Sequence, residues 1–152
     1  MFEKILGNER NKKILEKAIK LNKTSHSYLF WGTEGIGKKL IAKEFAKMIL
    51  CTDENKYCGK CKSCIEFESS NNPDFKIIEP DGNSLKIEQI REFQNKVSEK
   101  PIISNRKVYI INDSDKMTIE AQNCLLKTLE EPPEFVTIIL IGSNESAFLD
   151  TI

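Results

Sequence analysis

Residues 32–39 read GTEGIGKK, which is close to the phosphate-binding pattern G-x-x-x-x-G-K-[ST]. In that pattern, backbone N–H groups converge on phosphate oxygens at a helix N-terminus, and Lys38 would reach the β- and γ-phosphates. The next residue should carry the hydroxyl that binds Mg²⁺, but Lys39 stands there. A charged ammonium has no lone pair for a metal and repels a divalent cation. The loop is therefore predicted to keep its phosphate cradle without its metal anchor, the alternative being a glycine-rich turn that binds nothing.

The segment KVYIINDSDK, residues 107–116, tests this prediction independently. Proteins that hydrolyse nucleotides on such a loop place an acidic pair at the end of the third strand, to hold Mg²⁺ and to position water. Here Asn112 precedes Asp113. If Asn112 fills the first position, the metal loses a negative charge, whereas a shift by one residue would give Asp113 the metal role. A third reading is that Asp113 and Asp115 only cap a turn before the next helix.

These changes predict that hydrolysis is absent or feeble and that ATP or ADP binds weakly or not at all. No catalytic residue is expected, and the single histidine, His26, gives no pair for nucleophilic catalysis. The residues predicted from this pattern to border a degenerate nucleotide site are Gly32, Gly35, Gly37, Lys38, Lys39, Asn112 and Asp113.

Four cysteines follow the loop at close spacing, C-x₆-C-x₂-C-x₂-C, within residues 51–64. Four thiolates so spaced can surround a tetrahedral Zn²⁺, each at about 2.3 Å, and leave no open position for catalysis. Two disulfides are an alternative that conflicts with a reducing compartment, and an iron–sulfur cluster is another. We predict a structural zinc that folds a small insert, residues 51–72. The predicted ligands are Cys51, Cys58, Cys61 and Cys64, whereas Cys124 is interpreted as a core thiol.

Length and charge bound the remaining possibilities. A chain of 152 residues fits one domain, and its 23 basic and 23 acidic side chains argue against bulk electrostatic binding of nucleic acid. Neither a membrane-length apolar run nor the apolar core of a signal peptide is present, so a cytoplasmic location without membrane contact is expected.

Strand-like and helix-like segments alternate, which predicts an α/β fold with a parallel sheet covered by helices on both faces. Ligands of such sheets bind at the carboxyl ends of the strands, where the GTEGIGKK loop falls. Helical periodicity places Ile14 and Leu15 inward on the first helix, and Leu40 and Ile41 on the second. The expected strands are 27–32, 75–80, 107–113 and 136–142, and the expected helices are 8–23, 38–50, 84–100 and 117–133.

Several segments in this order resemble the delta-prime family of bacterial DNA polymerase III clamp-loader subunits, which are AAA+ proteins. They are GTEGIGKK, the four-cysteine insert, NNPDFKIIEP at 71–80 and, most specific, NCLLKTLEEPP at 123–133. The resemblance covers nearly all of residues 1–152 and implies a P-loop NTPase fold of the AAA+, RecA-like type. Asn72 departs from the histidine that the family usually has before Pro-Asp.

The resemblance implies a structural subunit that does not hydrolyse ATP, in a ring that loads the sliding clamp onto primed DNA. Its expected partners are the gamma or tau and delta subunits, the clamp and the DNA. ATP-hydrolysing gamma and tau subunits are similar too, but they normally keep the hydroxyl and the acidic pair that Lys39 and Asn112 replace. A gamma-type subunit is therefore the main alternative. A zinc-dependent DNA-binding module is disfavoured by the balanced charge and the closed metal shell.

The resemblance also places Ser143 or Asn144 at the family's γ-phosphate sensor position. It implies further parts beyond Ile152, namely a fifth strand beside 27–31, a Ser-Arg-Cys motif, a helical lid and a collar domain. Residues 1–152 are accordingly interpreted as a truncated nucleotide-binding domain. Without the fifth strand, strand 27–31 should form a sheet edge and leave apolar surface uncovered.

Overall fold

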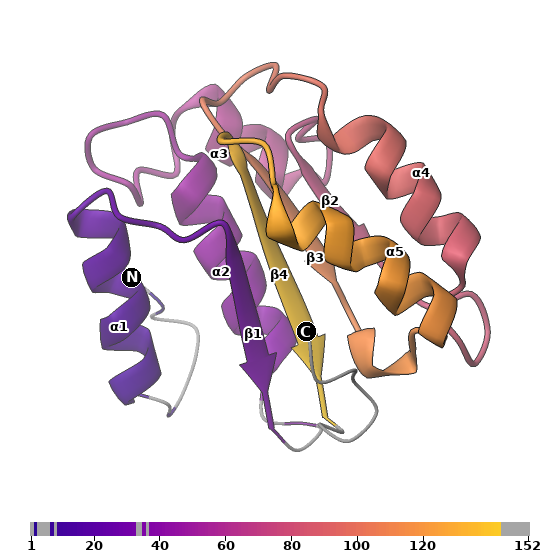
Figure 1. Ribbon diagram of the computed structural model, residues 1–152. Helices are drawn as coiled ribbons and strands as arrows, with labels where there is room; N and C mark the ends of the chain where they lie inside the picture. Colours follow the sequence, from indigo (N-terminus) through magenta and orange to yellow (C-terminus); the bar gives the residue numbers. More distant parts are fainter. Residues whose placement is uncertain (1, 3–6, 8, 33–34, 36, 144–152) are drawn as a thin grey trace.

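The computed structural model describes residues 2, 7, 9–32, 35 and 37–143 (Figure 1). Helices and strands alternate along this part of the chain as the sequence predicts, except that a short unexpected helix, Lys62–Glu68, follows the second expected helix. Their bounds are α1 (Glu9–Lys20), β1 (Ser27–Trp31), α2 (Lys38–Leu50), α3 (Lys62–Glu68), β2 (Phe75–Ile78), α4 (Ile87–Val97), β3 (Lys107–Ile111), the 3₁₀ turn η1 (Ser114–Lys116), α5 (Ile119–Glu130) and β4 (Val136–Gly142).

The four strands form one parallel sheet in the order β1-β4-β3-β2. Because a parallel connection must cross the sheet, a helical segment lies between each strand and the next. All four strands point the same way, so their carboxyl ends meet at one edge of the sheet, at the bottom of Figure 1. The predicted parallel α/β fold is thus confirmed.

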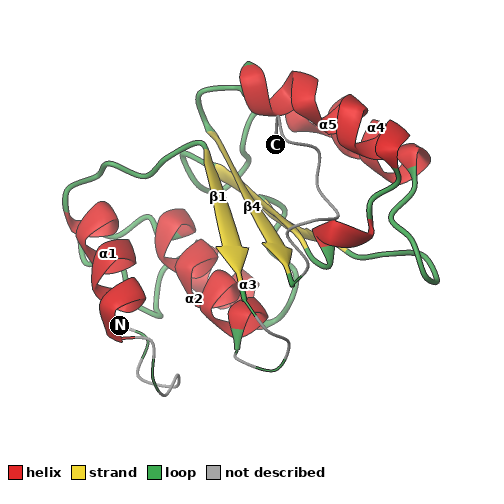
Figure 2. Ribbon diagram, turned by 60° about the horizontal axis from the view of Figure 1, so that its bottom comes forward, coloured by secondary structure: helices red, strands yellow, loops and turns green. Residues whose placement is uncertain are grey.

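Helices cover both faces of the sheet, with α1, α2 and α3 on one side and α4 and α5 on the other (Figure 2). The two faces follow from the alternation of side chains along a strand. On β3, Val108 and Ile110 belong to the core under α1 and α2, whereas Tyr109 and Ile111 belong to the core under α4 and α5. Both faces of β3 and β4 are buried, which explains their nearly continuous apolar sequences.

The expected inward faces of the first two helices are only partly right. Leu15 and Ile41 are buried, but Ile14 is 56% exposed and Leu40 is 45% exposed. Among the described residues β1 pairs with β4 alone and lies at the end of the sheet. Leu29 on this strand is 49% exposed, which agrees with the expectation that strand 27–31 forms an edge with uncovered apolar surface.

The last helix is shorter than the expected 117–133, and local residues set both of its ends. The Thr118 side chain caps α5 by accepting a hydrogen bond from the backbone N–H of Ala121 at 3.1 Å. The helix ends at Glu130, before Pro132, whose ring cannot continue it. No helix in the described ranges has the length and apolarity needed to cross a lipid bilayer.

A buried carboxylate, which the sequence analysis did not single out, fixes the chain leading into β3. Asp74 is 2% exposed, and its two oxygens accept backbone hydrogen bonds from Ile102, Ile103 and Ser104 at 2.6, 2.8 and 2.7 Å. Three charge-assisted bonds compensate the burial of its charge. This part of the PDF segment, residues 73–75, is therefore a structural clamp between the starts of β2 and β3.

Candidate nucleotide site and metal centre

The glycines of the predicted phosphate loop lie between the end of β1 and the start of α2. Gly35 and Gly37 have φ angles of 81° and 85°, a left-handed region that strains residues carrying a Cβ. Gly37 is the N-cap of α2, and Lys38 is the first helical residue. Thr33, Glu34 and Ile36 of the motif lie outside the described residues. The described part has the strand–turn–helix arrangement that a phosphate-binding loop requires.

The Lys38 ammonium is held by three neutral oxygen atoms. Its Nζ donates to the carbonyl of Gly32, to the carbonyl of Gly142 at 3.0 Å and to Ser143 Oγ at 2.8 Å. An ammonium has three N–H donors, so these contacts use all of them, but none neutralises the charge. Lys38 therefore brings the predicted loop and the end of β4 together and keeps its positive charge available to an anion.

Lys39, which stands where the hydroxyl should be, is paired with a residue that the sequence analysis missed. Its Nζ lies 2.6 Å from Oε1 of Glu79, which directly follows β2. The side chain of Asn112 donates to the same oxygen at 3.3 Å. Both bonds lower the pKa of Glu79 below its usual value, and the bond from Lys39 has the larger effect. The two departures from the pattern, Lys39 and Asn112, thus meet on one carboxylate.

The turn after β3 is fastened to the end of β4. Ser114 is buried and donates from Oγ to the carbonyl of Ile141 at 2.8 Å, and Asp115 Oδ2 accepts from the N–H of Ser143 at 3.3 Å. Asp113 has a left-handed backbone, with φ 49°, which is uncommon without a glycine. Asp115 therefore joins the turn to the end of β4, whereas Asp113 makes no side-chain cap to η1. Asn144, the alternative sensor residue, lies outside the described residues.

One cavity of about 550 Å³ joins most of the predicted nucleotide-site residues. Such a volume is typical of ligand pockets. Gly32 is absent from its lining but contacts Lys38, whereas Leu40, Lys43 and Ile141 line it without having been predicted. The predicted residues that line it are Gly35, Gly37, Lys38, Lys39, Asn112, Asp113 and Ser143.

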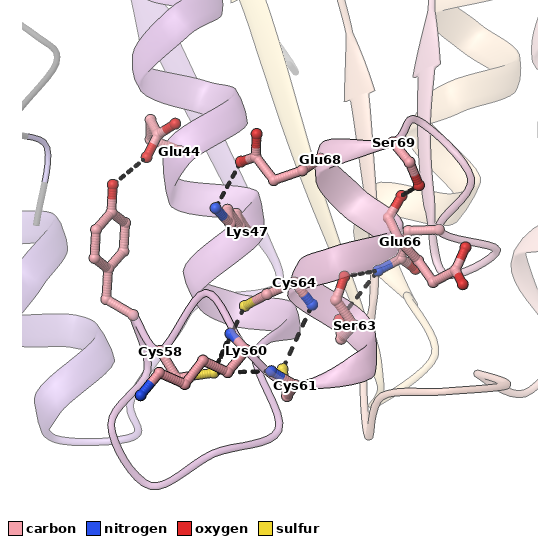
Figure 3. Close-up of polar contacts among 12 residues, drawn as sticks. Glu44, Lys47, Cys58, Lys60, Cys61, Ser63, Cys64, Glu66, Glu68 and Ser69 are labelled. Carbon is pink, nitrogen blue, oxygen red and sulfur yellow. Dashed lines mark hydrogen bonds and ion pairs between the residues drawn. The ribbon is translucent and has the colours of Figure 1, made fainter.

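The four predicted metal ligands come together beside the start of α3. Figure 3 shows three of them, Cys58, Cys61 and Cys64. The Sγ atoms of Cys51, Cys58, Cys61 and Cys64 all lie within 4.8 Å of one another. The Sγ of Cys51 lies 3.5 Å from that of Cys58 and 3.9 Å from that of Cys61, and the Sγ atoms of Cys58 and Cys64 are 4.0 Å apart. All four thiols are free, so the disulfide alternative is not the state seen here. The cluster could hold a metal ion.

Backbone N–H groups turn toward two of the sulfurs. Cys58 Sγ accepts from the N–H groups of Lys60 and Cys61, each at 3.3 Å, and Cys61 Sγ accepts from the N–H of Cys64 at 3.4 Å. Although burial opposes it, hydrogen bonds from Thr52 and Cys64 lower the pKa of the Cys61 thiol to about 6. Burial raises the pKa of Cys51 and Cys64. The surroundings thus lower the pKa of one thiol of the cluster and raise the pKa of two others.

The cysteine insert is tied to the sheet by polar contacts as well as by its helix. The Asn72 amide donates to the carbonyl of Ser63 at 2.9 Å and to its Oγ at 3.0 Å, and Asn72 Oδ1 accepts from the N–H of Asp74 at 2.9 Å. On its other side, Lys47 of α2 pairs with Glu68 of α3 at 2.6 Å (Figure 3). Asn72, which departs from the family's histidine, is therefore the buried joint between insert and sheet.

The cysteine cluster and the cavity lie at opposite ends of α2, because Lys38 and Lys39 at its start line the cavity and Cys51 directly follows its last residue. A helix of 13 residues is about 20 Å long, so a metal here cannot take part in chemistry at the phosphate loop. Cys124 lies apart from the cluster, on α5, where its thiol donates to Gln94 Oε1 at 2.9 Å. Cys124, interpreted from the sequence as a core thiol, is only partly buried and packs against the edge of the core under α4 and α5.

Comparison with known proteins decides the family. The family described as "DNA polymerase III, delta subunit" matches residues 7–152. The chain belongs to this family. It is 40% identical to subunit delta' of DNA polymerase III from Bacillus subtilis over 141 residues, 92% of this chain and 43% of that protein. It is also 39% identical to subunit tau/gamma from Haemophilus influenzae over 146 residues, 94% of this chain and 21% of that protein.

A solved structure supports both the family and the fold. A DNA polymerase III gamma subunit-related protein from Thermotoga maritima is 25% identical, with a TM-score of 0.61 over 91% of this chain and 42% of that chain. The resemblance to the delta-prime family and the predicted P-loop NTPase fold are therefore confirmed. The chain spans less than half the length of these relatives, and both delta' and tau/gamma proteins are among them.

Proposed function

We propose that this chain is the delta-prime-type subunit of a DNA polymerase III clamp loader. In this role it would join gamma or tau and delta subunits in a ring that places the sliding clamp on primed DNA, in the cytoplasm. The family match over residues 7–152 and the 40% identity to a delta' protein support this assignment. The subunit would act as a structural member of the ring and would not hydrolyse ATP.

The pairing of Lys39 with Glu79 is the observation that carries the proposed lack of hydrolysis. Phosphoryl transfer needs Mg²⁺ to neutralise charge on the departing phosphate. Lys39 takes the place of the expected hydroxyl, and its ammonium forms an ion pair with the nearby Glu79 carboxylate at 2.6 Å. Asn112 supplies an amide where an acid is expected. A magnesium ion would thus lack an oxygen ligand from α2 and would face an ammonium.

We propose that the four-cysteine cluster binds Zn²⁺ as a structural ion. A tetrahedral Zn(Cys)₄ centre with bonds of about 2.3 Å has sulfur–sulfur distances of about 3.8 Å. The observed sulfur–sulfur distances of 3.5, 3.9 and 4.0 Å bracket that value, and backbone N–H groups already face two of the sulfurs. The donor set therefore fits zinc. When bound, zinc would supply the cross-link that holds residues 51–72 together.

An ATP-hydrolysing gamma- or tau-type subunit is the second candidate. The 39% identity to a tau/gamma protein over 94% of this chain favours it. That candidate requires Mg²⁺ to bind despite Lys39, for example through Asp113, which also lines the cavity. Turnover of ATP therefore separates the two candidates.

Reconstitution tests the proposed role. The full-length protein should co-elute with gamma or tau and delta subunits on gel filtration, and alone it should show no Mg²⁺-dependent ATP turnover. In the complex, Lys38→Ala in this subunit should leave ATPase activity unchanged. The matched lysine change in the gamma or tau subunit, which removes a charge that stabilises the transition state, should lower it by about 100-fold or more. Turnover by this chain alone would favour the gamma-type candidate, and failure to join the complex would reject both.

A further inference from the structure

The cavity beside the phosphate loop is rich in cations. Among the described residues, its lining contains three lysines, Lys38, Lys39 and Lys43, and one carboxylate, that of Asp113. Lys39 and Lys43 are one helical turn apart on α2, an arrangement in which like charges repel each other. An anion between them would relieve that repulsion. The composition of the lining therefore favours an anionic ligand over a cation.

Two described carboxylates at or beside the cavity already have lysine partners. Glu79 Oε1 lies 2.6 Å from the Lys39 ammonium, and Asp113 Oδ2 lies 3.8 Å from that of Lys116. The Asn112 amide also directs an N–H toward Glu79 at 3.3 Å. A divalent cation entering here would have to displace an ammonium to reach either carboxylate. The site is thus poorly suited to bind an anion that carries a divalent metal ion.

Two of the lysines keep charge that an anion could use. Lys38 donates to neutral oxygens. Lys43 forms no ion pair within 4.0 Å among the described residues, although its charge helps to lower the pKa of Glu79. Lys39 is exposed at the mouth of the cavity and needs only a side-chain rotation to leave Glu79 for a ligand. The Lys39–Glu79 ion pair is exposed, so an incoming anion could take the place of Glu79 at the ammonium.

We propose that this cavity binds phosphate-bearing anions in their metal-free form, a nucleoside di- or triphosphate or pyrophosphate, and that Mg²⁺ weakens this binding. The reason is electrostatic, because Mg²⁺ removes two negative charges from the ligand and brings a divalent cation against Lys39. In ATP-hydrolysing relatives of the P-loop type, Mg²⁺ instead binds through a hydroxyl at this position. The proposal deepens the proposed function, on which it rests, by naming the ligand form that the site accepts.

Isothermal titration calorimetry on the full-length protein tests the proposal, with pyrophosphate, ADP and ATP titrated in EDTA and in excess MgCl₂. All three should bind in EDTA, and Mg²⁺ should raise their Kd roughly tenfold. If pyrophosphate binds as tightly as ADP and ATP, the phosphates account for the recognition. If ADP binds more tightly than pyrophosphate, the nucleoside contributes as well. Both results support the proposal.

Lys39→Ser removes the ammonium and restores the hydroxyl of the pattern. It should weaken binding of the anion in EDTA, and Mg²⁺ should no longer raise the Kd. Lys13→Ser, which changes an exposed lysine on α1, is the matched control and should behave as the wild type. The wild-type titrations decide the proposal even if a variant fails to fold. No binding in EDTA, or tighter binding with Mg²⁺, would overturn it, while assembly with the partner subunits would still stand.

Discussion

Replacing Cys64 with alanine should abolish zinc binding and unfold the insert, residues 51–72. Cys64 is 1% exposed and lies in the first turn of α3, where its own backbone N–H donates to Cys61 Sγ at 3.4 Å. A structural zinc contributes about 10–16 kcal/mol of apparent binding free energy, because the site forms only when the segment folds. With three ligands left, most of that energy should be lost, and the short α3 has few apolar contacts to replace it.

Unfolding of the insert should destabilise the neighbouring strand of the sheet but should not unfold the whole sheet. Phe67 on α3 packs against Phe75 of β2 with ring centroids 4.5 Å apart, and Asn72 joins Ser63 to the start of β2. We therefore expect increased hydrogen exchange in 51–72 and in β2. By contrast β3 and β4, which are buried on both faces, should stay protected.

Metal analysis and hydrogen exchange check this prediction together. The wild type should carry about one zinc per chain and the Cys64→Ala variant none. Cys124→Ala is the matched control, since this thiol lies on α5 outside the cluster, and it should retain the metal. A strong chelator should reproduce the variant's exchange pattern in the wild type. A metal-free protein whose insert is nevertheless fully protected would show that zinc has no structural role.

Asp74→Ala should cause the second-largest effect, a loss of about 3 kcal/mol or more in the free energy of unfolding. The substitution leaves three buried backbone N–H groups without their acceptor, those of Ile102, Ile103 and Ser104. Asp74→Asn should have a smaller effect, because one amide oxygen can still accept. Thermal unfolding should show a midpoint roughly 10 °C lower for the alanine variant.

Asp81→Ala provides the control for Asp74, because Asp81 follows the same strand but is exposed. Its midpoint should stay within about 2 °C of the wild type. If Asp74→Ala were equally harmless, the three short hydrogen bonds would not contribute to stability. Hydrogen exchange at residues 102–104 would localise the effect, since these N–H groups should lose protection first.

Part of the candidate site could be predicted from the sequence because its signals are local. Four cysteines within residues 51–64 are already close in the chain, so their spacing alone indicates a common centre. The glycines and Lys38 form a continuous motif between a strand and a helix. The alternation of apolar strands with helical segments likewise predicts the parallel sheet, because parallel strands need crossover connections.

The partners of the altered residues could not be predicted from the sequence because they are distant in the chain. Glu79 lies 40 residues from Lys39, and Asp74 lies about 30 residues from Ser104. No local pattern marks either carboxylate. The exposure of Ile14 and Leu40 could not be predicted either. Periodicity gives the faces of a helix, but not how much of each face a neighbouring element covers.

The amino-acid sequence by itself determined the family, the parallel α/β fold, the four-thiol cluster and the lack of a hydroxyl after Lys38. Each depends on residue type and on spacing along the chain. The tertiary structure decided where the Lys39 ammonium goes, which oxygens hold Lys38 and which backbone groups Asp74 clamps. Those outcomes depend on the strand order β1-β4-β3-β2, which brings the ends of separate strands to one edge of the sheet.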